Sequence, residues 1–557
     1  MNWNWTSAIR RWFDPAQGAP GHLIPRWLFL RALGLIYFSA FYSLVFQIRG
    51  LTGPQGILPA SQYLAAVARG FGPLRFWFAP SLLWISSGSH MLMALCWVGI
   101  AASLLVVANV WPRATLAICF ICFISFVTTA GDFSSYQSDG MLLEAGFLSL
   151  FFAPGGFWPG WGSKHPPIRA SLFLLLWEWF RIYFESGVVK LASGDPEWRH
   201  LTAMDQYYQN GPLPTWIGYY VQHFPHWFQA ATVVGTFVLE LGVVWMMFMP
   251  RRWRIACFFI ATLWQIPVIL TANYAFLNYI VLVLGVLLLD DRFLARFVPA
   301  RWRPAVAATP ISEADSIRDP DTALHINPAR YAEVHTERQT LPPARPSGIR
   351  RQLRALRVAF IAVVLGWIFY ATTLPMLQIF WRSIPLPDGP VTALQPFRIA
   401  NQYGLFAVMT PHRYEIEFQG SNDGRTWTAY PFRYKPQDVY KAPGIYAPYQ
   451  PRFEWNLWFA SLGTWTQYPL VINTEVLLLR NDPAVLALFD GNPFPDSPPR
   501  YLRAVLWQYW FSTLKEKREQ GIWWRRQLLG LYAPTLERQP DGRIAVVQQP
   551  ALTGPED

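Results

Sequence analysis

Four charged residues stand within one apolar stretch of membrane-spanning length, and they are Glu178, Arg181, Glu185 and Lys190. Each would cost kilocalories in lipid unless it is paired or faces the interior of a helix bundle. On a helix, Glu178, Arg181 and Glu185 stand at i, i+3 and i+7 and share one face, so Arg181 can pair with either acid. Lys190 lies off that face and begins the outer loop. The spacing therefore favours either an ion-pair clamp between helices or a buried working site.

Neighbouring apolar stretches carry further ionisable residues, and two interpretations of the whole set remain open. In the first, ion pairs hold the bundle in register, and the candidates are Glu178, Arg181, Glu185, Glu240 and Arg31. In the second, a pocket serves a membrane enzyme that acts on a quinone, a lipid or a protein side chain, and the candidates are Lys190, Asp139, Glu144 and Glu185. Asp139 and Lys190 stand at the outer edge, where side chains reach water.

The outer loop after Lys190 offers a second group of candidates, Asp195, Trp198 and Arg199, which form either part of a site or a folded loop. No metal site is expected, because the histidines lack ligand spacing and Cys119 and Cys122 have no further ligand nearby. The sequence also lacks a Gly-rich phosphate loop and the common hydrolase motifs, so we expect no cofactor.

The composition is that of a membrane protein. Of 557 residues, 53% are hydrophobic and only 14% are charged, where a soluble protein has about 25% charged residues. Nine spans are predicted, near residues 27–48, 89–110, 112–130, 140–154, 168–190, 227–249, 253–271, 274–289 and 355–380. The net charge of +12 comes from arginines in alternate loops, which indicates topology rather than nucleic-acid binding.

The positive-inside rule divides the chain into five regions. We expect a cytoplasmic N-terminus (1–26), a helical membrane domain (27–290), a flexible cytoplasmic linker rich in Pro and charge (291–353), a last transmembrane helix (354–380) and an external domain (381–557). No disulfide is expected, since all four cysteines lie in apolar runs.

The external domain is predicted to be mainly β, of sandwich type, with a few helices. Tyr414, Ile416 and Phe418 alternate with Glu415 and Glu417, which is typical of a half-buried strand. Residues 501–511 and the run "GRIAVVQQ" also read as strands, whereas 454–462 and 473–489 read as helices.

Several long blocks then carry a resemblance. "RWLFLRALGLIYFSAFYSLVFQIRGLTGPQGILP", "QSDGMLLEAGFLSLFFAP", "FESGVVKLASGDPEWRHLTAMDQYYQNGPLP" and "NQYGLFAVMTPHRYEIEFQGSNDGRTW" together resemble the lipase maturation factor family. The resemblance implies a membrane-bound accessory factor for the folding, assembly or maturation of secreted lipases or other exported proteins, with no catalysis of its own. Its partners would be membrane lipids and an exported client, and not nucleic acid.

The external domain would bind the client. Aromatic residues near "APYQP" could form such an interface, or could fill the core of the domain and its seam with the membrane part. These candidates are Tyr446, Tyr449, Phe453, Trp455 and Trp458. The external domain has no N-x-[ST] acceptor and no cysteine, which suits a bacterial inner-membrane protein with this domain in the periplasm. In a eukaryote the membrane would be that of the endoplasmic reticulum.

A shorter segment, "YFESGVVKLASGDPEW", is similar to the Tyr-Phe-x-x-Gly-x-x-Lys segment of vitamin K-dependent γ-carboxylase and related membrane proteins. That similarity implies an alternative function, a membrane enzyme in which Lys190 acts as a base. A lipid or small-molecule binding protein is a third possibility.

Overall fold

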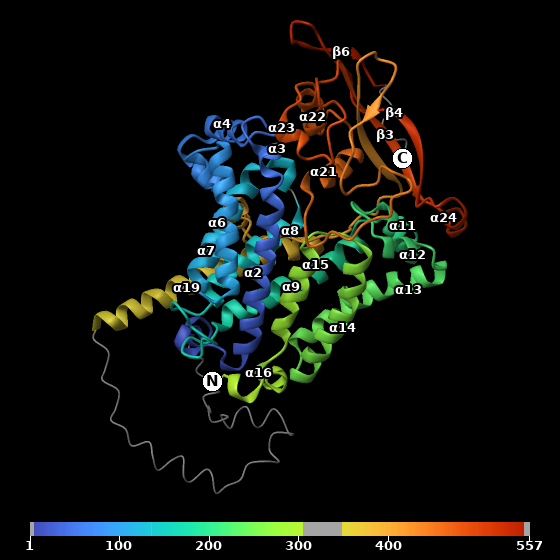
Figure 1. Cartoon of the computed structure of the whole chain (residues 1–557). Coiled ribbons are helices and arrows are strands. Elements are labelled where there is room, and N and C mark those ends of the chain that lie inside the picture. The colour runs from blue at the N-terminus through green and yellow to red at the C-terminus, as the bar shows by residue number, and fades with distance from the viewer. Residues whose placement is uncertain (1–4, 135, 305–347, 551–557) are drawn as a thin grey trace, which may run out of the picture.

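The long apolar runs form a bundle of helices, and the C-terminal part of the chain forms a smaller domain at one end of that bundle (Figure 1). The computed structural model describes residues 5–134, 136–304 and 348–550. The N-terminus and α16 (Asp291–Leu294) lie at the end of the bundle opposite the C-terminal domain. We call the two parts the bundle and the outer domain.

Six helices among the described residues are long and apolar enough to cross a membrane. They are Pro20–Val45, which contains α2 (Leu23–Val45); α6 (Ser89–Val107); α7 (Pro112–Thr129); His226–Phe248, which joins α13 (His226–Phe237) to the turns η6 (Val238–Gly242) and η7 (Val243–Phe248); α14 (Arg251–Thr271); and Arg351–Phe380 in α19 (Gly348–Phe380). In α13–η7 and in α14, only 28% and 22% of the 18-residue apolar stretch of the helix is buried within the protein. These helices therefore present a wide apolar surface to lipid.

Three more predicted spans also form helices, but they do not meet the same length and charge requirements. They are α8 (Gln137–Phe152), α9 (Arg169–Ala192) and the pair α15 (Leu277–Gly285) and η8 (Val286–Leu288). Two of these are short, and α9 carries five charged residues. All three stand in the middle of the bundle among the long helices (Figure 1), and most of their side chains are buried. Neighbouring helices thus replace lipid around them, which permits their polar residues.

Short helices connect the spans at both ends of the bundle. They are α1 (Trp5–Phe13), α3 (Ile48–Thr52), α4 (Ala60–Phe71), α5 (Arg75–Phe78), α10 (Pro196–Arg199), α11 (Met204–Asn210), α12 (Trp216–Gln222) and α20 (Gly389–Leu394). Of these, α3, α4, α11 and α12 lie at the end that carries the outer domain (Figure 1).

The region predicted as a linker, 291–353, is only partly described. Residues 291–304 form α16 and the turns η9 (Ala295–Phe297) and η10 (Ala300–Trp302) and pack on the bundle, which corrects the prediction for this part. The reason is Asp291, which is buried and accepts the backbone N–H groups of Leu23 and Ile24 at 3.0 and 2.7 Å, capping α2. The predicted flexibility of residues 305–347 concerns a segment outside the described residues.

The outer domain is built on one antiparallel sheet. Its strands are β1 (Arg413–Ser421), β2 (Thr428–Ala429), β3 (Tyr501–Phe511), β4 (Trp524–Leu531), β5 (Thr535–Arg538) and β6 (Ile544–Gln548). They are ordered β2-β1-β3-β5-β6, and β4 pairs beside β5 on the same edge of β3. Strands β1 and β3 pair along nine residues, with Ile416 opposite Leu506.

The predicted sandwich-like arrangement is not confirmed, because all six described strands belong to this one sheet. Helices cover the sheet instead: α21 (Arg452–Ser461) packs on β1, and α22 (Pro469–Leu479) packs on β3 and β5, with α23 (Pro483–Leu486) beside it. Apolar faces of these helices provide the cover that a second sheet would give.

Strand β1 is buried on both faces, which corrects the expectation of a half-buried strand. Ile416 and Phe418 are fully buried, and so are Glu415 and Glu417 on the other face. Glu415 is held by an ion pair with Arg413 and by Lys435, whose Nζ lies 2.7 Å from it. Alternation along the strand was read correctly, but a buried ion pair on the polar face cannot be distinguished by pattern from a solvated one.

Glu475 of α22 gives the outer domain a pH-dependent stability. It is fully buried, and burial raises the pKa of its carboxyl well above the usual value, although the backbone of Ala504 counteracts this. The unfolded chain releases this proton near pH 4.5, so the free energy of unfolding falls as pH rises from there towards the raised pKa, by up to about 1.4 kcal/mol per pH unit.

We predict that Glu475→Gln removes this contribution. The melting temperature of the full-length protein in detergent should exceed that of the wild type by a margin that grows between pH 5 and pH 8. Glu516→Gln, on the exposed helix α24 (Leu514–Gln520), is the control and should give no growing margin. A pH-independent difference for Glu475→Gln would contradict the assignment.

Candidate functional site

The polar residues of the bundle gather where the outer domain meets it, and they bond to that domain rather than to one another alone. This region, which we call the junction, is formed by α8, α9 and η6 of the bundle together with residues 401–410 and α21 of the outer domain. Residues predicted from two spans, α8 and α9, therefore meet residues that follow them by some 220 to 310 positions.

Arg181 lies at the centre of the junction. It is fully buried and forms an ion pair with Glu144 of α8, and its Nη1 donates to the carbonyl oxygen of Asn401 at 2.5 Å. The other oxygen of Glu144 accepts the Tyr403 hydroxyl at 2.9 Å and the Asn401 backbone N–H at 3.0 Å. One carboxylate thus joins a bundle arginine to the first segment of the outer domain.

The partner of Arg181 differs from the prediction, which placed it on its own helix. Glu185 instead accepts the backbone N–H of Tyr403 at 2.6 Å. Glu178 is fully buried, and neither of its oxygens has a hydrogen-bond partner among the described residues, although Arg181, Glu144 and Tyr403 are its electrostatic neighbours. Residues at i, i+3 and i+7 share a face. That face of α9 packs against α8, and the carboxylate of Glu144 on α8 forms the ion pair with Arg181.

Asp139 and Arg452 form the second contact across the junction. Nη1 and Nη2 of Arg452, at the start of α21, each lie 2.7 Å from one oxygen of Asp139, and Nη1 also donates to the Phe133 carbonyl at 2.7 Å. Both side chains are buried. Asp139 was expected to reach water at the outer edge, but the outer domain covers it. Paired donors on one guanidinium fix the orientation of α21 as well as its position.

Lys190 and Glu240 form the third ion pair. Lys190 Nζ lies 2.9 Å from both oxygens of Glu240 and 5.2 Å from the centre of the Trp198 ring. A Cβ added at Gly187 would lie 2.8 Å from Leu241, so this glycine allows α9 and η6 to approach closely enough for the pair. Lys190 is 3% exposed and does not begin an outer loop, because α9 continues to Ala192.

Within the part of the chain that the structure describes, Arg31 has no ion-pair partner, which differs from the prediction. It packs over the ring of Trp27 at 4.3 Å and donates to the Trp27 carbonyl at 3.1 Å, so its partners are one turn away on α2. A residue type in an apolar run does not show which way the side chain points.

The predicted outer-loop residues are folded against the outer domain. Asp195 caps α10 by accepting the Glu197 N–H at 2.9 Å, and it also accepts the Met409 N–H at 2.5 Å. The indole of Trp198 donates to the Phe406 carbonyl at 3.0 Å. Arg199 is exposed. Two of the three candidates therefore hold the segment 406–409 in place, which is the folded-loop interpretation.

The aromatic client candidates fill the junction and the core. Phe453, Trp455 and Trp458 are 2%, 6% and 8% exposed, and the ring of Trp455 lies 5.3 Å from that of Tyr136 of the bundle. Tyr449 receives a hydrogen bond from Gln47 of the bundle at 3.2 Å, and the N–H of Tyr446 donates to Asn273 at 2.7 Å. Tyr446 and Tyr449 stay partly exposed. The three buried residues therefore pack in the core of the outer domain and at its contact with the bundle, and do not form an exposed interface.

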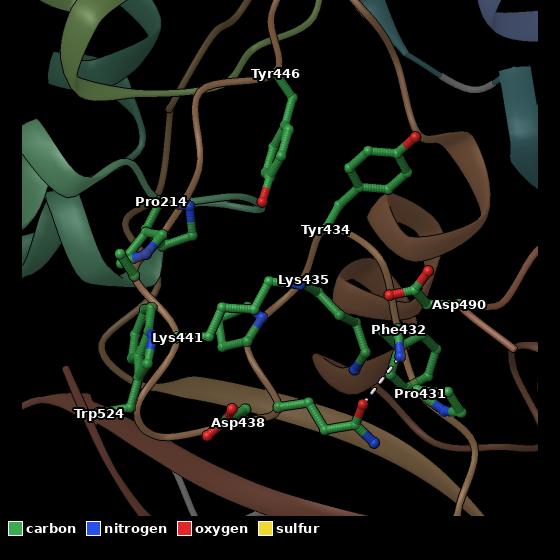
Figure 2. Close-up of a pocket in the computed structure, with 14 residues that line it drawn as sticks. Pro214, Pro431, Phe432, Tyr434, Lys435, Asp438, Lys441, Tyr446, Asp490 and Trp524 are labelled. Carbon is green, nitrogen blue, oxygen red and sulfur yellow. Dashed lines mark hydrogen bonds between the residues drawn. The ribbon is translucent and has the colours of Figure 1, made fainter. Parts of the chain in front are cut away.

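Several hollows lie near the junction, and two of them bear on the aromatic candidates. One, of about 390 Å³, is lined mainly by aromatic and aliphatic side chains, among them Tyr136, Tyr274, Val408, Trp455 and Trp458. The other, of about 200 Å³, lies between Pro214 of the bundle and the outer domain, and Figure 2 shows the rings of Tyr434 and Tyr446 beside it.

Glu454 shapes one wall of the smaller hollow. Its carboxylate accepts the backbone N–H groups of Arg433, Tyr434 and Lys435 at 2.6 to 2.9 Å. Burial raises its pKa to about 7 even against these three donors. The hollow thus has a fixed wall and, in Lys441 and Asp438, charged groups at its lining.

No group of three or more His, Cys, Asp or Glu side chains that could hold a metal ion occurs within residues 5–134, 136–304 and 348–550. The arrangement orients one domain on the other through the Asp139–Arg452 pair and buried hydrogen bonds, and the larger hollow beside them, mainly apolar in its lining, can receive an apolar group.

Sequence reasoning missed the outer-domain half of the junction, namely Asn401, Tyr403 and Arg452. Arg452 stands directly before the aromatic run of α21, so a lone arginine in an apolar context was the available signal. Its partner Asp139 lies 313 residues earlier, and a single sequence holds no measure of that distance.

A bundle of apolar helices, joined to an outer sheet domain by the buried Asp139–Arg452 ion pair and by buried hydrogen bonds, defines a multi-pass integral membrane protein. The family description "Lipase maturation factor transmembrane domain" matches residues 24–296, and "Lipase maturation factor C-terminal domain" matches residues 399–534. The chain belongs to the lipase maturation factor family, as the resemblance of its sequence blocks predicted.

Curated relatives agree with this assignment. The chain is 32% identical to lipase maturation factor 2 of Gallus gallus, an alignment that covers 92% of this chain and 81% of the relative. It is 30% identical to lipase maturation factor 2 of Homo sapiens (93% and 83% covered) and 30% identical to lipase maturation factor 1 of Bos taurus (93% and 89% covered). No solved structure matches the chain.

We predict that Arg452→Gln destabilises the junction, because it leaves Asp139 buried without its cation, at a cost of about 3–5 kcal/mol. Limited proteolysis of the membrane-embedded protein should release the outer domain much faster than in the wild type. Arg500→Gln is the matched control: it removes an arginine from the exposed pair with Glu537 and should change the rate little. Restoration by adding Asp139→Asn to Arg452→Gln would confirm the pairing, and equal effects of both arginine variants would contradict it.

Proposed function

We propose that the protein is a membrane-bound accessory factor for the folding, assembly or maturation of exported lipases or related exported proteins, and that it catalyses no reaction itself. The observation that carries this proposal is the similarity to lipase maturation factors over more than nine-tenths of the chain, through both domains and in the same order. The junction supports it, because a domain fixed at the membrane surface can present one constant face to a client.

The topology that we propose has nine crossings, with α8, α9 and α15–η8 added to the six apolar helices. Residues 1–26 and 291–353 would then lie in the cytoplasm and the outer domain, residues 381–557, on the other side. The arginines at the α16 end of the bundle support this orientation. We further propose a bacterial inner membrane with a periplasmic outer domain, in keeping with its lack of cysteines and N-x-[ST] acceptors.

The client surface that we propose lies around the smaller hollow and the partly exposed Tyr446 and Tyr449. Tyr440, which is 64% exposed, stands near it in sequence. Tyrosines suit such a surface because they offer apolar area and a polar tip at low entropic cost.

No specific observation favours the alternative of a membrane enzyme with Lys190 as base. Lys190 Nζ lies 2.9 Å from both oxygens of Glu240, so this side chain is engaged by a carboxylate of its own domain. Asp139, Glu144 and Glu185, the acids assigned to the same pocket, each bond to the outer domain.

The function is tested by deleting the gene in its own host and measuring the specific activity and amount of secreted lipase. We expect lower specific activity at unchanged lipase transcript, restored by the wild-type gene. Unchanged secretion and activity of all exported lipases would overturn the proposal.

The role of Lys190 is tested in the same complementation. We predict that Lys190→Met alone lowers the abundance of the factor, because Glu240 is left buried without a cation, whereas Lys190→Met with Glu240→Leu restores both abundance and lipase maturation, because an apolar pair can replace a buried ion pair. A double variant that is abundant but inactive would favour the enzyme instead.

A further inference from the structure

The end of the bundle opposite the outer domain carries a hollow that the proposed function does not use. It has a volume of about 1100 Å³ and lies between α1, the start of α9, η7 and the start of α14. Its lining divides into two kinds: three arginines, Arg11, Arg169 and Arg254, and an apolar wall that includes Phe173, Leu176 and Phe248.

The two kinds of lining follow each other along α9. Arg169, Phe173 and Leu176 stand at i, i+4 and i+7 and share one face, so the wall runs from a charged end into the apolar part of the bundle over about 10 Å. Phe248, across the hollow, is 49% exposed and continues the apolar surface towards lipid. Such a wall fits an amphiphile with its charged head at the arginine-lined end of the hollow.

The charge of the head group follows from the arginines. Among the described residues that line the hollow there is no Asp or Glu. Nearby described acids are engaged elsewhere: Asp290 pairs with Arg251, Asp14 pairs with Arg354 at 2.6 Å, and Asp291 accepts the backbone N–H groups of Leu23 and Ile24. His22 also lines the hollow, and its Nε2 is buried without a hydrogen-bond partner among the described residues. Several donors with no acid among them favour an anion.

We propose that this hollow binds one anionic phospholipid, with its phosphate at the end lined by Arg11 and Arg254 and an acyl chain along Phe173, Leu176 and Phe248. The arginine-rich end faces the cytoplasmic leaflet under the positive-inside rule, and basic pockets between helices on that side suit anionic head groups. Helix α1 carries Arg10, Arg11 and Trp12, and the ring of Trp12 lies 5.9 Å from that of Phe173. This helix therefore covers the hollow on the side of the membrane–water interface. This proposal is independent of the client function.

The site is tested by native mass spectrometry of the full-length protein, freed of lipid in detergent and titrated with phosphatidylglycerol or with phosphatidylcholine of the same acyl chains. We expect the wild type to prefer phosphatidylglycerol, and Arg11→Gln with Arg254→Gln to bind it about tenfold or more weakly. The control is Arg10→Gln with Arg252→Gln, which removes the same charge from neighbouring exposed arginines outside the lining.

Each result decides the proposal. Equal binding of the two lipids, or equal losses in the two double variants, would overturn it, since attraction would then be to net charge alone. Inorganic phosphate is the competitor that separates a lipid from a free anion: if phosphate displaces phosphatidylglycerol from the wild type, the site is one for small anions and the lipid proposal fails. Equal melting temperatures of the two double variants would exclude misfolding as the cause of a selective loss.

Discussion

A buried charge needs a partner, and in this protein three acids of the bundle have a partner in the outer domain. Glu144, Glu185 and Asp139 bond to residues 401, 403 and 452, while Lys190 and Glu240 satisfy each other. In the interior of a membrane domain no water can compensate a missing partner. The relative position of the two domains is therefore fixed by electrostatics of the bundle, and the aromatic packing of α21 fills the space that this position leaves.

The same constraint explains which features the sequence could reveal. Apolar runs and alternation predicted the long helices, β1, β3 and the helical character of residues 454–462, because these depend on local periodicity. Burial on both faces of β1 and the single sheet depend on what packs from elsewhere in the chain. The partner of Arg181 could not be read from spacing, because the i, i+3, i+7 face shows where the guanidinium points and not which helix it meets.

Residue chemistry was likewise ambiguous where one type serves two purposes. The tryptophans and tyrosines near "APYQP" suit an exposed interface and a packed seam equally, and burial separates them: Trp455 lies against Tyr136, whereas Tyr440 is exposed. Lys190, three residues after Gly187, resembled a catalytic lysine, yet Gly187 allows the close approach of η6 to α9. Family membership could be inferred from the sequence because long blocks of residues resemble the family, whereas the roles of single residues could be assigned only from the structure.

The Asp139–Arg452 pair also orders the protein in time. Arg452 is synthesised 313 residues after Asp139, which at about 5–20 residues per second is roughly 15–60 s. During that interval α8 and α9 stand in the membrane with Asp139 and Glu185 lacking their outer-domain partners, while Glu144 has only Arg181. The bundle is thus an unfinished binding site for its own C-terminal half, and a chain truncated before α21 would display uncompensated acids to the membrane's quality-control machinery.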